Sequence, residues 1–160
     1  MKRLGLAFLG AAAMACLVAP HAGSAQEKKG AFIDGEYVED YVYVPDYISP
    51  DDLKKAIETH STDIVIVDTA AQPVWEDEHI TGAINFPYQK DIAAPVPLPR
   101  DKTLVVYCAC KAEEDSTDVA RQLSLLGYRK VKVLKGGWFK WVDLKYPTVG
   151  TGKDDDKAAK

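Results

Sequence analysis

Uninterrupted hydrophobic runs alternate along the chain with segments in which hydrophobic residues recur every three or four positions. The runs at residues 63–68 and 103–107 are rich in valine and isoleucine and carry no charge in their interior, and shorter runs occupy residues 131–134 and 83–86. Continuous runs of this kind are typical of strands buried on both faces of a parallel sheet. We therefore predict four strands at these positions.

Two amphipathic helices are predicted between the strands. Ser49 is a suitable N-cap, and Pro50 is tolerated in the first helical position of a segment that continues to about His60. The apolar positions of residues 116–126 fall on one helical face, and Gly127 suits the left-handed end of that helix. Strands that alternate with helices indicate an α/β fold with a mainly parallel central sheet flanked by helices.

The first 25 residues have the pattern of a secretory signal peptide. A positively charged start precedes the uncharged apolar run of residues 4–19, and the small residues 23–25 suit cleavage. A retained membrane anchor needs about 20 apolar residues, which is longer than this run. We expect a periplasmic or secreted protein with no membrane attachment after cleavage; a lipoprotein acylated on Cys16 is the alternative.

The remaining chain divides into three regions. Residues 26–47 alternate tyrosine and valine and favour an extended arm or an edge hairpin, with Pro45 arguing against a central strand. We interpret this Tyr-rich arm as covering a sheet edge, and a strip that binds a protein partner is the alternative. Residues 48–147 hold the predicted strands and helices, and residues 148–160 are expected to be a mobile polar tail.

Composition limits the classes of function. With 47% hydrophobic and 28% charged residues, the 160-residue chain suits one globular domain. Its net charge of −4, without a long basic cluster after the first 25 residues, argues against nucleic acid as a partner. Three cysteines are too few for a disulfide scaffold. We expect a monomer.

The candidate chemistry is a Cys-x-Cys pair directly after the predicted strand 103–107. Ligands of open parallel sheets bind beyond the carboxyl ends of the strands, and the following helix points its N–H groups at this loop, which favours a thiolate. The strand-end position favours Cys108 over Cys110 as the nucleophile. We expect a substrate to contact the rest of the loop, namely Ala109, Lys111, Ala112, Glu113, Glu114, Asp115 and Ser116.

Motifs on both sides of this loop closely resemble the rhodanese-like sulfurtransferase domain family. Residues 79–87 read His-Ile-Thr-Gly-Ala-Ile-Asn-Phe-Pro, residues 136–141 read Gly-Gly-Trp-Phe-Lys-Trp, and the resemblance covers about residues 48–147. It implies a three-layer α/β domain whose loop cysteine accepts sulfane sulfur as a persulfide. The sulfur then passes to a thiol or another nucleophilic acceptor. The implied partners are a small sulfur-containing donor and this acceptor, with no metal and no organic cofactor.

The loop departs from the usual family pattern. Members generally carry a Cys-x-x-Gly-x-Arg-Ser loop and a basic residue two positions after the aspartate of the second strand. Here the loop contains no arginine or glycine, Lys111 is its only cation among three acids, and Ala70 stands two positions after Asp68. Because thiosulfate is a dianion, we expect weak turnover of thiosulfate. The loop is also longer than usual, and counting back from Ser116 points to Cys110 instead.

Two other functions stay open. The missing arginines and the Tyr-rich arm also fit a non-catalytic binding module. Two thiolates this close can alternatively form a thiol-redox or soft-metal site, because they can close a disulfide or bind Cu(I). In an oxidising compartment we expect Cys108 and Cys110 to form a disulfide.

The remaining polar and aromatic candidates are interpreted as structural. We expect Asp68 to bond neighbouring backbone N–H groups and His79 to support a turn. Trp138 and Trp141, one helical turn apart, are expected to pack in the core. Glu113 and Glu114 are predicted to be a solvated stretch of the loop.

Overall fold

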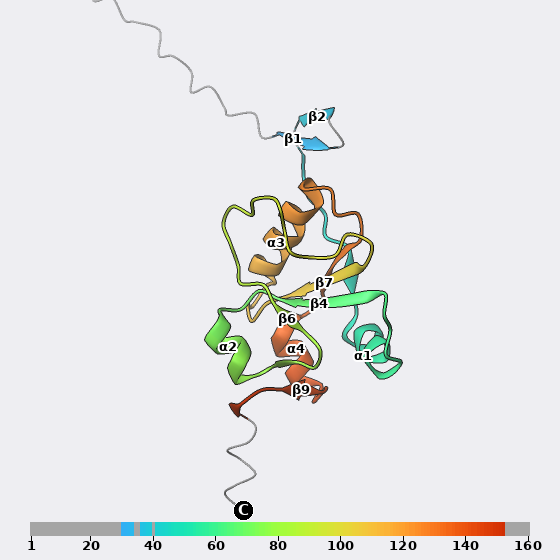
Figure 1. Ribbon diagram of the computed structural model, residues 1–160, viewed down its shortest axis with the longest axis vertical. Helices are drawn as coiled ribbons and strands as arrows, with labels where there is room; N and C mark the ends of the chain where they lie inside the picture. Colours follow the sequence, from blue (N-terminus) through green and yellow to red (C-terminus); the bar gives the residue numbers. More distant parts are fainter. Residues whose placement is uncertain (1–29, 34–35, 40, 153–160) are drawn as a thin grey trace, which may run out of the picture.

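The computed structural model describes residues 30–33, 36–39 and 41–152 (Figure 1). The predicted signal peptide and the alternative at Cys16 lie outside the described residues, as does the polar tail from residue 153 onward. None of the helices in the described part of the chain is long and apolar enough to cross a membrane.

The centre of the molecule is a five-stranded, fully parallel sheet with the order β3-β8-β7-β4-β6. Its strands are β3 (Tyr47–Ile48), β4 (Ile64–Asp68), β6 (Ile84–Asn85), β7 (Thr103–Tyr107) and β8 (Val131–Leu134). The predicted parallel sheet is confirmed, and the three strands with the strongest hydrophobic runs occupy its middle.

In the described residues, four helices connect and cover the strands: α1 (Pro50–Glu58), α2 (Gln72–Asp77), α3 (Glu114–Leu125) and α4 (Gly137–Asp143). As predicted, the Ser49 hydroxyl caps α1 by accepting a hydrogen bond from the Asp52 N–H (3.1 Å). The helix α3 begins two residues earlier than predicted, and Gly127 follows its end with a φ of 86°. Figure 1 shows α3 on one face of the sheet and the other three helices on the opposite face.

Successive side chains of each strand point to opposite faces of the sheet, so the core consists of two clusters, one on each face. Val67, Val106 and Val133 pack with Val119 and Leu123 of α3. The opposite cluster contains Leu53 of α1, Trp141 of α4 and the strand residues Ile66, Val105, Tyr107 and Leu134. Because β4, β7 and β8 contribute to both clusters, their sequences are hydrophobic on both faces. The result is the predicted three-layer arrangement.

Within the part of the chain that the structure describes, two antiparallel strand pairs lie outside the central sheet. The strands β1 (Gly30–Ile33) and β2 (Glu36–Glu39) form a hairpin within the Tyr-rich arm. The arm then joins the edge of the sheet, where the Asp46 carbonyl accepts a hydrogen bond from the Val133 N–H (2.8 Å).

The second pair consists of β5 (His79–Ile80) and β9 (Thr148–Val149). The segment expected to be a mobile polar tail therefore begins with an ordered strand. Backbone pairing fixes this strand, and the Thr148 hydroxyl also donates a hydrogen bond to the Glu78 carboxylate (2.6 Å).

Candidate active site

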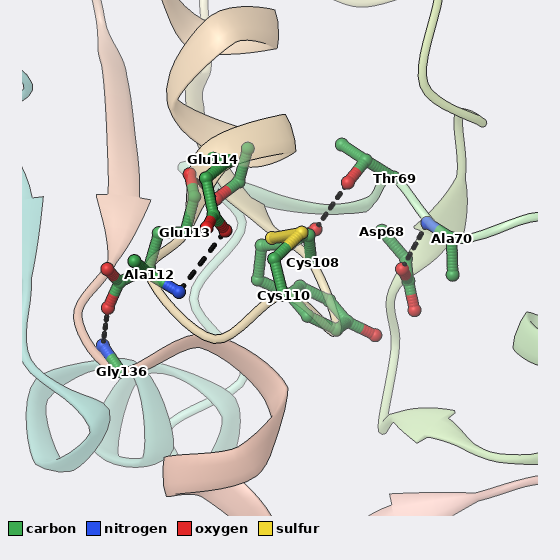
Figure 2. Close-up of a disulfide and its surroundings, with 11 residues drawn as sticks. Asp68, Thr69, Ala70, Cys108, Cys110, Ala112, Glu113, Glu114 and Gly136 are labelled. Atoms are coloured by element: carbon green, nitrogen blue, oxygen red, sulfur yellow. Dashed lines mark hydrogen bonds between the residues drawn. A yellow bond between two sulfur atoms is a disulfide. The ribbon is translucent and has the colours of Figure 1, made fainter.

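The loop between β7 and α3, residues 108–113, lies beside the carboxyl end of β4. Asp68, the last residue of β4, is in register with Tyr107, the last residue of β7. The next residue, Thr69, donates two hydrogen bonds to the Tyr107 carbonyl, from its N–H (3.0 Å) and its hydroxyl (3.1 Å). Figure 2 shows the two cysteines between residues 68–70 on one side and the start of α3 on the other. The structure therefore places the loop cysteines at the carboxyl ends of two neighbouring parallel strands.

The two loop cysteines are joined by a disulfide, with Cα atoms 5.4 Å apart (Figure 2). Cys108 is only 1% exposed, whereas Cys110 is half-buried. The start of α4 packs on Cys108: the Trp138 N–H donates to the Cys108 carbonyl (3.0 Å). A Cβ on Gly137, whose φ is 52°, would lie 2.8 Å from the same carbonyl oxygen. Glycine is therefore required where α4 approaches the strand end.

A pocket of about 320 Å³ opens beside the disulfide. The loop and the first turn of α3 contribute Cys108, Ala109, Cys110 and Asp115 to its lining. The opposite wall is formed by Thr69, Ala70, Ala71, Val74, Pro87 and Tyr88. None of these residues was predicted from the sequence to contact a substrate, although Ala70 was noted at the position where a basic residue is usual. Asp115 is the one charged side chain in this lining among the described residues. The pocket therefore has no cation to attract an anionic ligand.

Two glutamates at the junction of the loop and α3 accept hydrogen bonds from backbone N–H groups. Glu113 adopts a left-handed conformation (φ 53°), and its carboxylate accepts a hydrogen bond from the Gly136 N–H (2.6 Å). In Figure 2 this carboxylate points away from the sulfur atoms. Glu114 is exposed and accepts a hydrogen bond from the Ala112 N–H (3.2 Å). The expectation of a solvated stretch is wrong for Glu113, because the turn before α4 supplies a backbone donor for its carboxylate.

Of the other residues expected to contact a substrate, some line the pocket and others do not. Ala109 and Asp115 line the pocket with the cysteines. Ser116 is fully buried, and its hydroxyl donates to the Glu113 carbonyl (3.1 Å), so it supports the helix start. Lys111 and Ala112 are exposed and are not among the residues that line this pocket.

Below the pocket, Asp68 is a buried carboxylate at 3% exposure. It accepts a hydrogen bond from the Ala70 N–H (2.8 Å), as predicted. Burial raises the pKa of Asp68, and hydrogen bonds from Tyr107 and the Ala70 N–H oppose this rise. Burial and the nearby Asp68 charge also raise the pKa of Tyr107, whose hydroxyl oxygen accepts from the Ile80 N–H (3.1 Å). These two side chains brace the ends of β4 and β7.

His79 and the two tryptophans have structural positions. The His79 ring stacks on Trp75 at 4.1 Å between centroids, and its Nδ1 lies 2.6 Å from the Trp75 carbonyl oxygen. Trp141 is fully buried and donates a hydrogen bond to the Pro147 carbonyl (3.0 Å). Trp138 stacks on Tyr107 at the base of the loop, at 6.4 Å between centroids. Trp141 thus packs in the core as expected, whereas Trp138 is half-buried against the same cluster and His79 lies in β5.

One feature of the sequence could have identified part of the pocket wall that was not predicted. Thr69, Ala70 and Ala71 directly follow β4, the strand that pairs with β7. Loops after neighbouring parallel strands meet at the same edge of the sheet, so this segment could have been selected from strand order alone. Among the described residues, no group of three or more His, Cys, Asp or Glu side chains could hold a metal ion.

Comparisons with known proteins agree with this geometry. The family profile of the rhodanese-like domain matches residues 49–144. Thiosulfate sulfurtransferase GlpE from Coxiella burnetii is 32% identical over 92 residues, which cover 58% of this chain and 83% of the relative.

Solved structures show the same fold. The BH2092 protein from Bacillus halodurans is 28% identical with a TM-score of 0.62, and the match covers 67% of this chain and 78% of that protein. The rhodanese-like domain of the Alr3790 protein from Anabaena is 24% identical with a TM-score of 0.58, covering 69% and 83% of the respective chains.

Proposed function

The chain belongs to the rhodanese-like domain family, and from this premise we propose that it is an exported sulfurtransferase or persulfide carrier. The observation that carries the proposal is the position of Cys108 and Cys110 in a pocket at the carboxyl end of β7. The site takes sulfane sulfur from a small donor and passes it to a thiol or another nucleophile. The signal-peptide pattern of residues 1–25 supports action in the periplasm or outside the cell.

Sulfur loading requires the reduced loop, so a thiol reductant must first open the disulfide. A cysteine thiolate then attacks the outer sulfur of the donor. With thiosulfate, the sulfur–sulfur bond of the donor breaks, sulfite leaves with the electron pair, and the cysteine becomes a persulfide. The N-terminus of α3, which directly follows the loop, favours both the thiolate and the persulfide anion.

The charges of the pocket favour a donor with less negative charge than thiosulfate. Asp115 lines the pocket, and Ala70 occupies the position at which the family usually carries a cation. A dianion therefore meets a like charge and no counter-charge, which lowers its local concentration. We propose an organic persulfide or a monoanionic thiosulfonate as a better donor class.

Mass spectrometry of the reduced protein tests this function. The protein is incubated with thiosulfate or benzenethiosulfonate, alkylated, and digested, and the peptide with residues 108–110 is examined for one added sulfur atom. In the wild type we expect either added sulfur on this peptide or release of the transferred sulfur as sulfide, and in a Cys108→Ala/Cys110→Ser double variant we expect neither. A wild type that takes up sulfur from neither donor would contradict the proposal.

A further inference from the structure

We propose that Cys108 and Cys110 form a self-resolving pair: sulfur loads on Cys110, and Cys108 then displaces it as hydrosulfide. The inference rests on the proposed function, because it begins from a persulfide. It goes further in adding an activity, the reductive release of sulfide from sulfane sulfur without an external acceptor.

The bond between the two sulfur atoms supports this proposal. The Cα atoms are 5.4 Å apart, which lies within the usual range of about 4.4–6.8 Å for disulfides. A persulfide on Cys110 keeps its inner sulfur at the Cys110 Sγ position. The thiol of Cys108 can therefore reach the atom it must attack without rearrangement of the fold.

Burial assigns different roles to the two cysteines. Cys110 is half-buried at the pocket, so a donor in solution meets it first. Cys108 is 1% exposed and its carbonyl is held by Trp138, so it is shielded from large donors and acceptors. This assignment differs from the strand-end argument, which favoured Cys108 as the nucleophile, because the approach of α4 covers the strand end.

The two steps balance in atoms and electrons. In the first, the Cys110 thiolate takes the outer sulfur of thiosulfate, and sulfite leaves. In the second, the Cys108 thiolate attacks the Cys110 Sγ, a Cys108–Cys110 disulfide forms, and the outer sulfur leaves with the bonding pair as hydrosulfide. The two cysteine sulfurs are oxidised and the transferred sulfur is reduced. A dithiol reductant then restores both thiols for the next cycle.

Tethering favours the internal reaction over transfer to a dissolved thiol. Cys108 and Cys110 are separated by a single residue, so attack is intramolecular, and its effective concentration exceeds that of millimolar thiols in solution. A persulfide on Cys110 is therefore short-lived in the wild type. Removing Cys108 should make it long-lived.

A single-turnover experiment tests the pair. The full chain is reduced, freed of reductant and mixed with benzenethiosulfonate, and released sulfide and the mass of the peptide with residues 108–110 are followed in time. For the wild type we expect about one sulfide per chain, with the peptide ending as a disulfide. For Cys108→Ser we expect a lasting persulfide on Cys110 and sulfide release at least about tenfold slower.

Controls separate the possible results. Because Cys108 is buried, Cys108→Ala provides a second variant without a buried hydroxyl, and Cys110→Ser should neither load nor release sulfur rapidly. A wild-type persulfide as lasting as that of Cys108→Ser would overturn the self-resolving pair and leave the proposed function intact. Loading of Cys108 in Cys110→Ser at the rate of the wild type would overturn the division of roles. Absence of added sulfur and sulfide in every variant would overturn both proposals.

Discussion

The two walls of the pocket differ in how they are held. The segment after β4 is fixed by short backbone contacts: Thr69 donates twice to Tyr107 and accepts from the Tyr88 N–H (2.9 Å), and the Asn85 amide donates to the Ala70 carbonyl (2.8 Å). The sulfur-bearing loop is fastened near its two ends, at Cys108 and Glu113, while Ala109, Lys111 and Ala112 between them are exposed.

This difference allows one wall of the pocket to stay in place while the cysteine loop moves. In the proposed reaction a persulfide adds an atom to a cysteine, and the loop would have to accommodate this atom and later close the disulfide. The wall after β4 provides a fixed surface, whereas the centre of the loop can adjust between its two attachments. The attachments decide where Cys108 lies. Substitutions that disturb an attachment, a brace of the fixed wall or the charge of the pocket should therefore differ in their effects.

The largest effect is expected for Gly137→Ala. Its Cβ would lie 2.8 Å from the Cys108 carbonyl oxygen, and its φ of 52° disfavours a side chain. We expect a loss of about 2–4 kcal/mol in the free energy of unfolding, measured with urea. The matched control is Gly82→Ala, which has a φ of 82° and no atom within 4 Å of the added Cβ. It should cost only about 1–2 kcal/mol, and equal losses would contradict the role of the close approach.

A smaller loss is expected for Tyr107→Phe, which removes a brace of the fixed wall. The change leaves the buried Ile80 N–H without its acceptor and removes one of the two hydrogen bonds that Asp68 accepts from the described residues, so that only the Ala70 N–H still donates to this carboxylate. We expect a loss of about 2 kcal/mol in urea unfolding. Tyr88→Phe serves as the control because Tyr88 is 41% exposed and its hydroxyl donates to Asp118 at 3.3 Å. A loss no greater than that of the control would argue against the brace.

The third prediction concerns pH. Since the pKa of Asp68 is raised above its ordinary 3.8 in the folded state, its contribution to stability is present below pH 3.8 and is lost as pH rises through the raised pKa. In Asp68→Asn the side chain cannot ionise, so this pH-dependent loss of stability does not occur, and the amide oxygen can still accept a hydrogen bond from the Ala70 N–H. The stability of this variant relative to the wild type should therefore rise as the pH increases above 4. Urea unfolding across this range measures the effect.

Asp63→Asn provides the control for net charge in that series. Asp63 is exposed and immediately precedes β4, at the opposite end of the strand from Asp68. Parallel pH profiles for Asp68→Asn and Asp63→Asn would show that burial of Asp68 does not set the pH dependence.

The smallest effect is expected from the charge of the pocket. Asp115 shares the pocket with the cysteines, so neutralising it in Asp115→Asn should favour the thiolate and admit thiosulfate more easily. We expect iodoacetamide labelling and thiosulfate loading of the reduced protein to become about threefold faster at low salt, with a smaller gain at high salt. Glu113→Gln is the comparison, because that carboxylate faces Gly136 and should change neither rate. Equal effects of both changes would contradict this placement of charge.

The sequence was sufficient for the parts of the fold that are buried on both sides. The residues of β4 and β7 pack in both core clusters, so their hydrophobic runs have no polar interruption. In contrast, α2 was not predicted: its six residues include a proline and none is buried, so no apolar periodicity marks it.

The position of the candidate site could be predicted from the sequence, but its burial and its contacts could not. The strand-end rule located Cys108 correctly, yet its burial depends on α4, which follows some thirty residues later in the chain. The Glu113 contact depends on a left-handed backbone and on Gly136, and neither leaves a periodic signal. Pattern reasoning finds elements, whereas contacts between loops require the assembled fold.

The pairing of β3 with β8 has a consequence for folding kinetics. Tyr47 lies opposite Val133 at the edge of the sheet, so the first strand of the domain closes only after most of the chain is available. Contacts between residues so distant in sequence carry a large loop-closure cost and slow the search for the native state. The cysteines precede both β8 and the Trp138 contact in the chain, so an emerging polypeptide exposes its thiols before their cover exists. Until the sheet and α4 are complete, both thiols are therefore accessible to oxidants and to other thiols.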